Sequence, residues 1–265
     1  MPPTLFVSHG SPTLLIDDCP TRDFLKELGR QLGDVKGILC VSAHWETQVP
    51  VLTGVVQLET IHDFFGFPQK LYEKRYPASG NPKLAAQTAD LLREAGFEAE
   101  VEVVRGLDHG AWVPLALMYP EANVPVIQLS VQPRQSPEHH LRIGTALRSL
   151  REEGILILGS GAATHNLREF RWQPLDSPPD RYVTEFDEWL TEAVESGNTS
   201  ALCDYLETAP HGLKNHPTPE HFLPLFVAMG AAEHPEGRKL HHAFTFGIIS
   251  MATFAWGGSL NLQPS

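Results

Sequence analysis

The sequence contains few cysteines and few basic residues, and each scarcity excludes a class of protein. Only Cys19, Cys40 and Cys203 occur among 265 residues, an odd and scattered set. It excludes a disulfide framework and zinc sites of the Cys-x-x-Cys kind. Asp and Glu number 32 against 20 Lys and Arg, which gives a formal net charge of −12. That charge argues against a polyanionic partner, so we expect no nucleic-acid binding.

Targeting and membrane segments are missing as well. No apolar run has the length of a membrane span, so no membrane partner is expected. Residues 1–6 lack the basic segment and the long apolar stretch of a signal peptide. Together with the unpaired cysteines, this predicts a cytoplasmic protein. No Gly-rich loop followed by Lys and no Gly-x-Ser-x-Gly motif occurs, which disfavours nucleotide and serine-hydrolase chemistry.

What the sequence does contain is an alternation of short apolar runs and helical patterns. Strands are expected at residues 4–8, 36–42, 51–55, 98–104, 124–130, 155–159 and 243–249. Helices are expected at residues 21–32, 82–95, 111–118, 137–152, 182–196, 199–207 and 219–230. Asn81 and Ser136 each precede a proline at the first helical position, and Gly96 and Gly154 follow predicted helix ends. The alternation predicts a single α/β domain over residues 1–265, with a central largely parallel or mixed sheet flanked by helices on both faces.

Histidine is abundant, and several of the 13 histidines follow predicted strands. His9, His44 and His165 each come after a buried run that ends in small residues. Ligands bind at the carboxyl ends of strands in open α/β sheets, so these imidazoles are expected to converge. Neutral imidazole is the commonest metal ligand in proteins. The pattern therefore predicts a metalloenzyme.

Each strand-end histidine also has a structural alternative. His9 alone reads as a turn histidine bonded to a carbonyl, but beside His44 a metal ligand is favoured. Small residues before His44 leave room for a metal, although the ring could merely pack on Trp45, itself a candidate pocket wall for substrate. His165 follows five small residues, a run that reduces the packing area of the chain, so a further ligand or an acid/base group beside the metal is favoured over a plain loop histidine.

Three histidines near predicted helix starts extend the candidate site. The sequence predicts a helix with Thr218 as its cap and Pro219 as its first residue. His221 would then lie in the first turn, where it is the candidate third metal ligand. Glu220 is the alternative third ligand, or else a surface carboxylate favoured by the helix dipole. His216 is a candidate to support a ligand or to contact the substrate.

His109 follows Asp108, a candidate helix cap. A helix N-terminus disfavours imidazolium, so His109 would be a neutral proton acceptor, while a purely structural role is equally open. His62 lies in an aromatic stretch of the long irregular segment 57–81 and is a weaker candidate for substrate contact.

Ligands of this kind select a class of metal chemistry. Nitrogen and oxygen donors without thiolate suit non-haem Fe(II), Zn(II) or Mn(II) rather than Cu(I) or an iron–sulfur cluster. Three protein ligands leave coordination positions open for a substrate. An uncoordinated histidine nearby would supply a proton acceptor suited to neutral pH.

At these positions the chain resembles the class III (LigB-type) extradiol ring-cleavage dioxygenases, in the branch of the 4,5-DOPA extradiol dioxygenases. The resemblance covers nearly the whole chain and lies in six segments in family order: 8–12, 42–45, 61–64, 108–112, 164–167 and 216–221. It implies an Fe(II) site that binds a DOPA-like or related catechol through both hydroxyl oxygens, then O₂, and cleaves the ring beside the diol.

The resemblance also implies roles for individual residues. His9, His44 and His221 correspond to metal ligands, and His165 to an acid/base histidine that can complete four-coordination in zinc-loaded relatives. His109 corresponds to the second acid/base group, so one of the two histidines takes a catechol proton and the other returns a proton during ring cleavage. In the common set of ligands the third is a carboxylate, whereas this chain has His221 at the corresponding position. A set of three histidines favours uptake of Zn(II) over Fe(II).

Two other functions remain open from the residues. A zinc hydrolase with a metal-bound water would use the same ligands but would consume no oxygen. A non-catalytic binding protein on the same fold is the weaker alternative, since fold does not fix function. The physiological catechol and the choice between monomer and homodimer are left open by the sequence.

Overall fold

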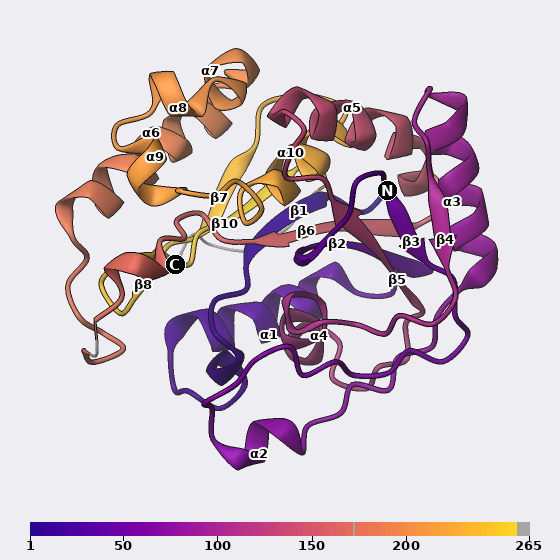
Figure 1. The fold of residues 1–265 in the computed structure, drawn as a ribbon, viewed down its shortest axis with the longest axis horizontal. Helices are drawn as coiled ribbons and strands as arrows, with labels where there is room; N and C mark the ends of the chain where they lie inside the picture. Colours follow the sequence, from indigo (N-terminus) through magenta and orange to yellow (C-terminus); the bar gives the residue numbers. More distant parts are fainter. Residues whose placement is uncertain (172, 259–265) are drawn as a thin grey trace.

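The structure is a computed structural model that describes residues 1–171 and 173–258. Eight of its strands form one sheet with the order β4-β3-β5-β2-β6-β1-β10-β7 (Figure 1). These strands are β1 (Thr4–Ser8), β2 (Gly37–Glu46), β3 (Val51–Thr53), β4 (Glu100–Glu102), β5 (Val126–Val131), β6 (Ile155–Gly161), β7 (Arg238–His241) and β10 (Thr253–Trp256).

The centre of the sheet is parallel and its two sides are mixed. The three central pairs, β5 with β2, β2 with β6 and β6 with β1, are parallel. By contrast, β3 pairs antiparallel with β5, and β10 pairs antiparallel with both β1 and β7. The prediction of an α/β fold with a parallel or mixed sheet is confirmed. Because β1, β2 and β6 run in the same direction, their carboxyl ends meet at one edge of the sheet.

Helices cover both faces of this sheet (Figure 1). One layer holds α3 (Pro82–Glu94), α5 (Pro137–Leu147) and α10 (Leu223–Gly230), and the opposite layer holds α1 (Pro20–Leu32) and α4 (His109–Met118). The remaining helices are α2 (Gln69–Tyr72), α6 (Arg181–Glu195), α7 (Thr199–Cys203), α8 (Tyr205–Thr208) and α9 (Gly212–Asn215). Among the described residues, no helix is both long and apolar enough to span a lipid bilayer.

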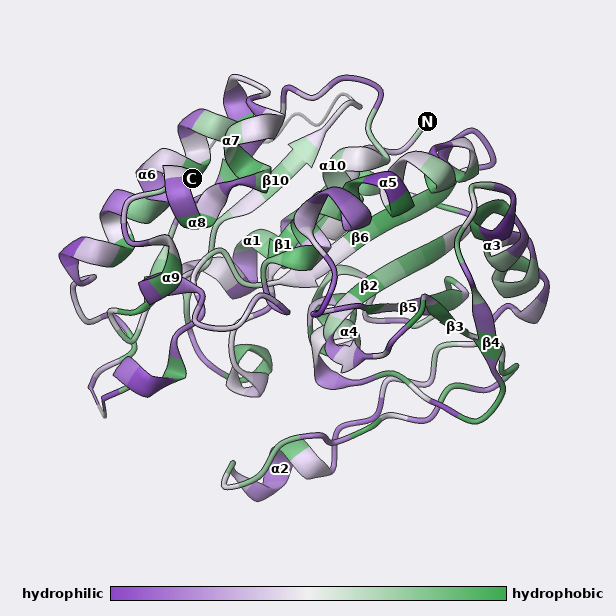
Figure 2. Cartoon of the chain, turned by 45° about the horizontal axis from the view of Figure 1, so that its top comes forward, coloured by the Kyte–Doolittle hydropathy of each residue, from purple (hydrophilic) through white to green (hydrophobic). Residues whose placement is uncertain are grey.

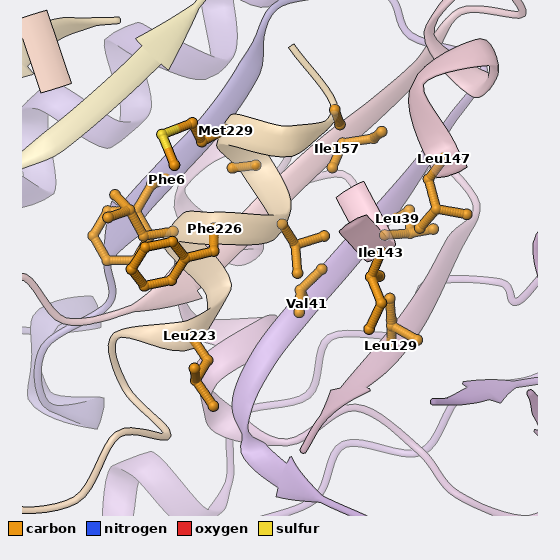
Figure 3. Packing of buried hydrophobic residues seen from close by; sticks show 14 of the residues in the cluster. Phe6, Leu39, Val41, Leu129, Ile143, Leu147, Ile157, Leu223, Phe226 and Met229 are labelled. Atoms are coloured by element: carbon orange, nitrogen blue, oxygen red, sulfur yellow. The ribbon is translucent and has the colours of Figure 1, made fainter. Parts of the chain in front are cut away.

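Alternation along the strands gives the protein two hydrophobic cores. In β1, Phe6 contacts the α10 side, while Leu5 and Val7 belong to the cluster on the α1 and α4 side. Successive side chains of a strand point to opposite faces, so a strand covered on both faces is apolar at nearly every position. Figure 2 shows this as continuous hydrophobic colour along β2 and β6. On the first face, Phe226 of α10 lies beside Phe6, as Figure 3 shows.

Local signals account for several helix ends. The side chains of Asn81, Ser136 and Asp108 accept hydrogen bonds from the N–H groups of the first turns of α3, α5 and α4. Gly96 and Gly154 adopt φ of +87° and +84°, as expected for residues that end helices. The helix expected at 137–152 ends at Leu147 and continues as a 3₁₀ turn, and the one expected at 199–207 divides into α7 and α8.

The prediction of a helix over 219–230 is wrong in its first turn, since α10 begins at Leu223. The carbonyl oxygen of His221 accepts a hydrogen bond from the N–H of Ala162, at 2.9 Å. It does not take part in a hydrogen bond of α10. His221 therefore lies in the turn before the helix, attached to the end of β6. This attachment moves the residue toward the edge where β1 and β2 also end.

The prediction of one strand at residues 243–249 is also wrong. Two short antiparallel strands stand there, β8 (Phe244–Thr245) and β9 (Ile249–Ser250). Phe246 and Gly247 between them have φ of +52° and +66°, a left-handed pair that reverses the chain. Strands β7 and β10, which extend the main sheet beyond β1, were not predicted from the sequence.

Candidate metal centre

The candidate site lies where the carboxyl ends of the parallel strands meet. His9 follows β1 directly, and its N–H donates to the carbonyl of Gly161 at the end of β6, at 3.0 Å. His44 is among the last residues of β2, which extends four residues further than the strand expected at 36–42. His221 joins them through its main-chain bond to Ala162. Three segments far apart in the sequence are thus brought together, two by the pairing of β1 and β2 with β6 and the third by this main-chain bond.

The three imidazoles present the same nitrogen to one point. Nε2 of His9 lies 3.0 Å from Nε2 of His44, and Nε2 of His221 lies 3.3 Å from the same His44 atom. Ligand atoms of the three side chains all lie within 4.8 Å of one another. Nitrogens at about 2.0–2.1 Å around a tetrahedral ion are about 3.3 Å apart, so the spacing fits one bound metal.

The other ring nitrogen of each histidine faces an oxygen acceptor. Nδ1 of His9 lies 3.0 Å from Oγ of Ser160, whose own hydroxyl donates to the carbonyl of Gly110. Ser160 is thus left to accept from His9. Nδ1 of His221 lies 2.9 Å from Oε1 of Glu220.

Nδ1 of His44 faces a carboxylate beyond hydrogen-bond distance, since Oδ2 of Asp63 lies 3.7 Å away. A hydrogen-bond acceptor at Nδ1 favours the tautomer that bears its proton there, so Nε2 of His9 and of His221 turns a lone pair toward the shared point. At His44 the negative charge of Asp63 favours the same tautomer through space.

Burial keeps these ligands neutral, which metal binding requires. Burial, followed by the neighbouring histidines, holds the pKa of His9 and His221 well below the ordinary value. Burial and the proximity of His109 lower the pKa of His44 to about 3, against the opposing influence of Asp63. Three neutral imidazoles with converging lone pairs form a donor set for Zn(II) or Fe(II).

Two further histidines flank the three. The ring of His165 stacks on that of His221, with centroids 3.4 Å apart and an interplanar angle of 12°. The ring centroid of His109 lies 3.9 Å from that of His44. The structure thus brings all five expected metal-site and acid/base histidines together. Burial lowers the pKa of His165 to about 4, so this side chain is a neutral base at neutral pH.

Close packing fixes the start of α4 against His44. A Cβ built on Gly110 would clash with Oγ of Ser42 and would lie 2.9 Å from Cδ2 of His44, so a larger residue there would push against β2 and the ligand ring. Asp108, fully buried, accepts from Oγ of Ser42 in β2 at 2.6 Å and from Arg105 at 3.1 Å. These bonds attach the helix that carries His109 to the strand that carries His44.

Asp63 belongs to the site but was not among the residues predicted from the sequence. Its Oδ1 lies 2.9 Å from Nδ1 of His109 and accepts from the main-chain N–H of His109, also at 2.9 Å. Partial burial raises the pKa of Asp63, but its contacts with His109 lower it further, to about 2, so the side chain is a carboxylate. Its signal in the sequence was its place beside His62 in the aromatic stretch of segment 57–81.

The expected substrate-contact residues lie in three different environments. His62 is half-buried, with its ring 5.6 Å from that of Trp112 at the rim of the site. His216 is buried and its Nε2 lies 2.9 Å from the carbonyl of Ala163, an arrangement that favours support of the site over substrate contact. Trp45 is also buried, beneath the guanidinium of Arg105 at 4.8 Å.

Comparison with known proteins gives this geometry a context. Residues 3–255 match the family described as the catalytic LigB subunit of aromatic ring-opening dioxygenase. The chain is 44% identical to the 4,5-DOPA dioxygenase extradiol of Beta vulgaris, over 95% of each chain. It is 40% identical to the protein of the same name from Escherichia coli K12, over 86% of this chain and 84% of that one.

A solved structure supports the fold. The crystal structure of an uncharacterized protein from Escherichia coli K12 superposes with a TM-score of 0.81 and 32% sequence identity. The similarity covers 97% of this chain and all (100%) of the other.

Proposed function

The chain belongs to the LigB family of aromatic ring-opening dioxygenases and is an extradiol ring-cleaving dioxygenase, and we propose that its substrate is a DOPA-like or related substituted catechol. The 4,5-DOPA dioxygenase names of its relatives support this choice of substrate class. We further propose that residues 1–265 act as one catalytic domain, in the cytoplasm. The free cysteines, Cys19, Cys40 and Cys203, support a reducing compartment.

In this proposal His9, His44 and His221 hold one divalent metal ion, Fe(II) for catalysis, with Zn(II) able to compete. When bound, Fe(II) supplies the Lewis acidity and the electron transfer that couple the catechol to O₂. The converging Nε2 atoms of the three histidines are the observation that carries the proposal. Oxygen acceptors at Nδ1 of His9 and of His221 hold these two rings in the orientation that a metal needs.

His109 and His165 exchange protons with the substrate. Asp63 beside Nδ1 of His109 leaves Nε2 as the nitrogen that can accept a catechol proton. His165, stacked on His221, is the second acid/base group, whereas His109 lies against His44. One histidine accepts a proton as the diol binds, and the other returns a proton to oxygen as the ring opens.

Anaerobic loading with Fe(II), followed by a panel of substituted catechols, tests this function. We expect oxygen consumption together with a new visible absorbance from a semialdehyde product. The variants His109→Ala and His165→Ala should lose on the order of 10²–10⁴-fold in turnover while retaining metal. Full turnover in His165→Ala would remove its acid/base role, and hydrolysis of esters or amides without oxygen uptake would replace the proposal by a zinc hydrolase.

A further inference from the structure

Two carboxylates of the site each lie between a proposed metal ligand and a proposed acid/base histidine. Asp63 approaches both His44 and His109. Glu220 approaches both His221 and His165. Both carboxylates are partly enclosed, with side-chain exposures of 24% and 14%. The same pairing thus occurs twice, once at His44 and once at His221.

The distances show that the two carboxylates are placed in opposite ways. Asp63 is close to the acid/base histidine, with Oδ1 2.9 Å from both Nδ1 and the main-chain nitrogen of His109. Its other oxygen is 3.7 Å from the ligand His44. Glu220 is close to the ligand, 2.9 Å from Nδ1 of His221, and 4.0 Å from Nδ1 of His165.

Such a difference in distance changes what a carboxylate can do. At 2.9 Å Oε1 of Glu220 is hydrogen-bonded to Nδ1 of His221, which fixes the orientation and tautomer of that imidazole. Oδ1 of Asp63 accepts from the main-chain N–H of His109 and lies at ion-pair distance from its Nδ1, so the carboxylate favours a proton on that nitrogen. At 3.7–4.0 Å the interaction is only electrostatic and leaves the ring orientation free. Each carboxylate can therefore control one histidine of its pair much more strongly than the other.

Neighbouring contacts keep the two carboxylates in these places. Asp63 lies on segment 57–81, which is attached to α4 by a bond from Nε1 of Trp112 to the carbonyl of Ile61 at 2.9 Å. Thr60 and Leu107 form a parallel bridge in the same region. Oε1 of Glu220 accepts from the hydroxyl of Thr218 at 3.1 Å. Segment 57–81 thus contributes Asp63 to the start of α4, and the turn before α10 contributes Glu220.

We propose that Asp63 and Glu220 are positioning residues with separate tasks. Asp63 holds His109 so that its Nε2 exchanges protons with the catechol, and Glu220 holds His221 so that its Nε2 binds the metal. The inference rests on the proposed function for the task of Asp63. The task of Glu220 concerns metal binding alone and stands independently of the substrate.

The variants Asp63→Asn and Glu220→Gln test the two tasks, because each keeps the shape of the side chain and removes its charge. Two quantities are measured for each: the Kd for Zn(II), by competition with a chromophoric chelator, and kcat and KM of the Fe(II)-loaded enzyme. Asp63→Asn should lower kcat by about 10–100-fold with little change in Kd or KM. Glu220→Gln should raise the Kd for Zn(II) by about 10–100-fold, with a smaller change in kcat at saturating Fe(II).

The matched control is Asp90→Asn, an exposed carboxylate of α3 that pairs with Arg93 at 2.8 Å. This variant should leave both quantities unchanged. If Asp63→Asn fails to fold, Asp63→Ser, which retains an acceptor oxygen without the charge, takes its place. Equal effects of the Asp63 and Glu220 variants on Kd would overturn the division of tasks.

A double variant separates positioning from a general loss of structure. If Asp63 acts through His109, adding Asp63→Asn to His109→Ala should lower kcat no further than His109→Ala alone. Effects that multiply would contradict the proposal. A wild-type enzyme that opens no catechol, while Glu220→Gln still weakens Zn(II) binding, would refute the proposed function and leave the task of Glu220 intact.

Discussion

The metal centre and the start of α5 both bury a histidine, but they satisfy it in different ways. At the start of α5, His140 has no exposed surface, and both of its ring nitrogens meet the main chain. Nδ1 lies 3.0 Å from the carbonyl of Ser136, and Nε2 accepts from the N–H of Gln132 at 3.1 Å. In the metal centre, Nδ1 of His9 and of His221 meets an oxygen acceptor, while the three Nε2 atoms face one another.

This difference shows that burial and low basicity do not identify a metal ligand. Burial lowers the pKa of His140 to about 4 and that of His44 to about 3. The two values are similar, although His140 has a complete set of main-chain partners. What distinguishes His44 is a lone pair with no donor of its own and with two other lone pairs beside it. Convergence, not burial, marks the site.

Replacement of a ligand should give the largest effect. His44→Ala removes one of the three converging nitrogens, and a metal ion contributes several kcal/mol to transition-state stabilisation. We expect ring cleavage to fall by on the order of 10³-fold or more, together with loss of tight Zn(II) binding. Chelator competition and oxygen consumption measure the two effects. His140→Gln is the control and should keep both properties, and metal binding as tight in His44→Ala as in the wild type would remove the distinction between the two regions.

Titration of His140 should give the next largest effect, on stability. Its folded pKa is about 4, below an unfolded value of roughly 6.5, so the unfolded chain binds the proton more readily. The stability due to neutral His140 is present above pH 6.5 and is lost as pH falls toward 4. Between pH 7 and pH 4.5 this loss amounts to roughly 2–3 kcal/mol.

His140→Gln keeps an acceptor and a donor but cannot titrate in this range. Denaturant unfolding at the two pH values should therefore show a smaller loss of stability in His140→Gln than in the wild type. An equal loss in both proteins would mean that His140 does not titrate as a buried neutral residue.

Removal of the acceptor behind a ligand should have a moderate effect. Ser160→Ala deletes the oxygen that lies 3.0 Å from Nδ1 of His9, so the ring loses its preferred tautomer. Loss of such a supporting partner weakens metal binding by about 10–100-fold. Zn(II) competition measures the change, and Ser136→Ala at the start of α5 is the matched control. An unchanged Kd in Ser160→Ala would show that the orientation of His9 is set elsewhere.

The smallest effect is expected at the rim. His62 is half-buried, and its Nε2 lies 3.0 Å from the carbonyl oxygen of Lys74. If it contacts the catechol, His62→Ala should raise KM by about 2–10-fold, the value of one hydrogen bond, and leave the Kd for Zn(II) unchanged. Steady-state kinetics with varied catechol measure this change, and an unchanged KM would remove His62 from the substrate site.

Local sequence signals predicted the parts of the fold that depend on neighbouring residues. β1 has the predicted bounds Thr4–Ser8, and α3 begins at Pro82 as its cap indicated. The short strands β7 and β10 were missed because their pairing depends on an edge that β1 offers only after the sheet has formed. The start of α10 was misplaced because a distant partner, Ala162, takes the carbonyl of His221.

The same limit applies to the site. His9, His44 and His221 could be proposed because strand ends and helix starts are visible in the sequence. The contacts of Ser160 with His9 and of Asp63 with His109 could not be predicted from the sequence. Ser160 meets His9 across 151 positions of the chain, through the pairing of β1 with β6. Asp63 meets His109 across 46 positions, from a segment without regular pairing. Such contacts follow from the tertiary fold and leave no periodic pattern.

X-ray absorption of the Zn(II)-loaded protein tests most directly whether three histidines share one ion. The account predicts one Zn(II) per chain with at least three imidazole nitrogens at about 2.0–2.1 Å, and one imidazole fewer in His221→Ala. A shell made mainly of oxygen, or an imidazole count that His221→Ala leaves unchanged, would contradict it.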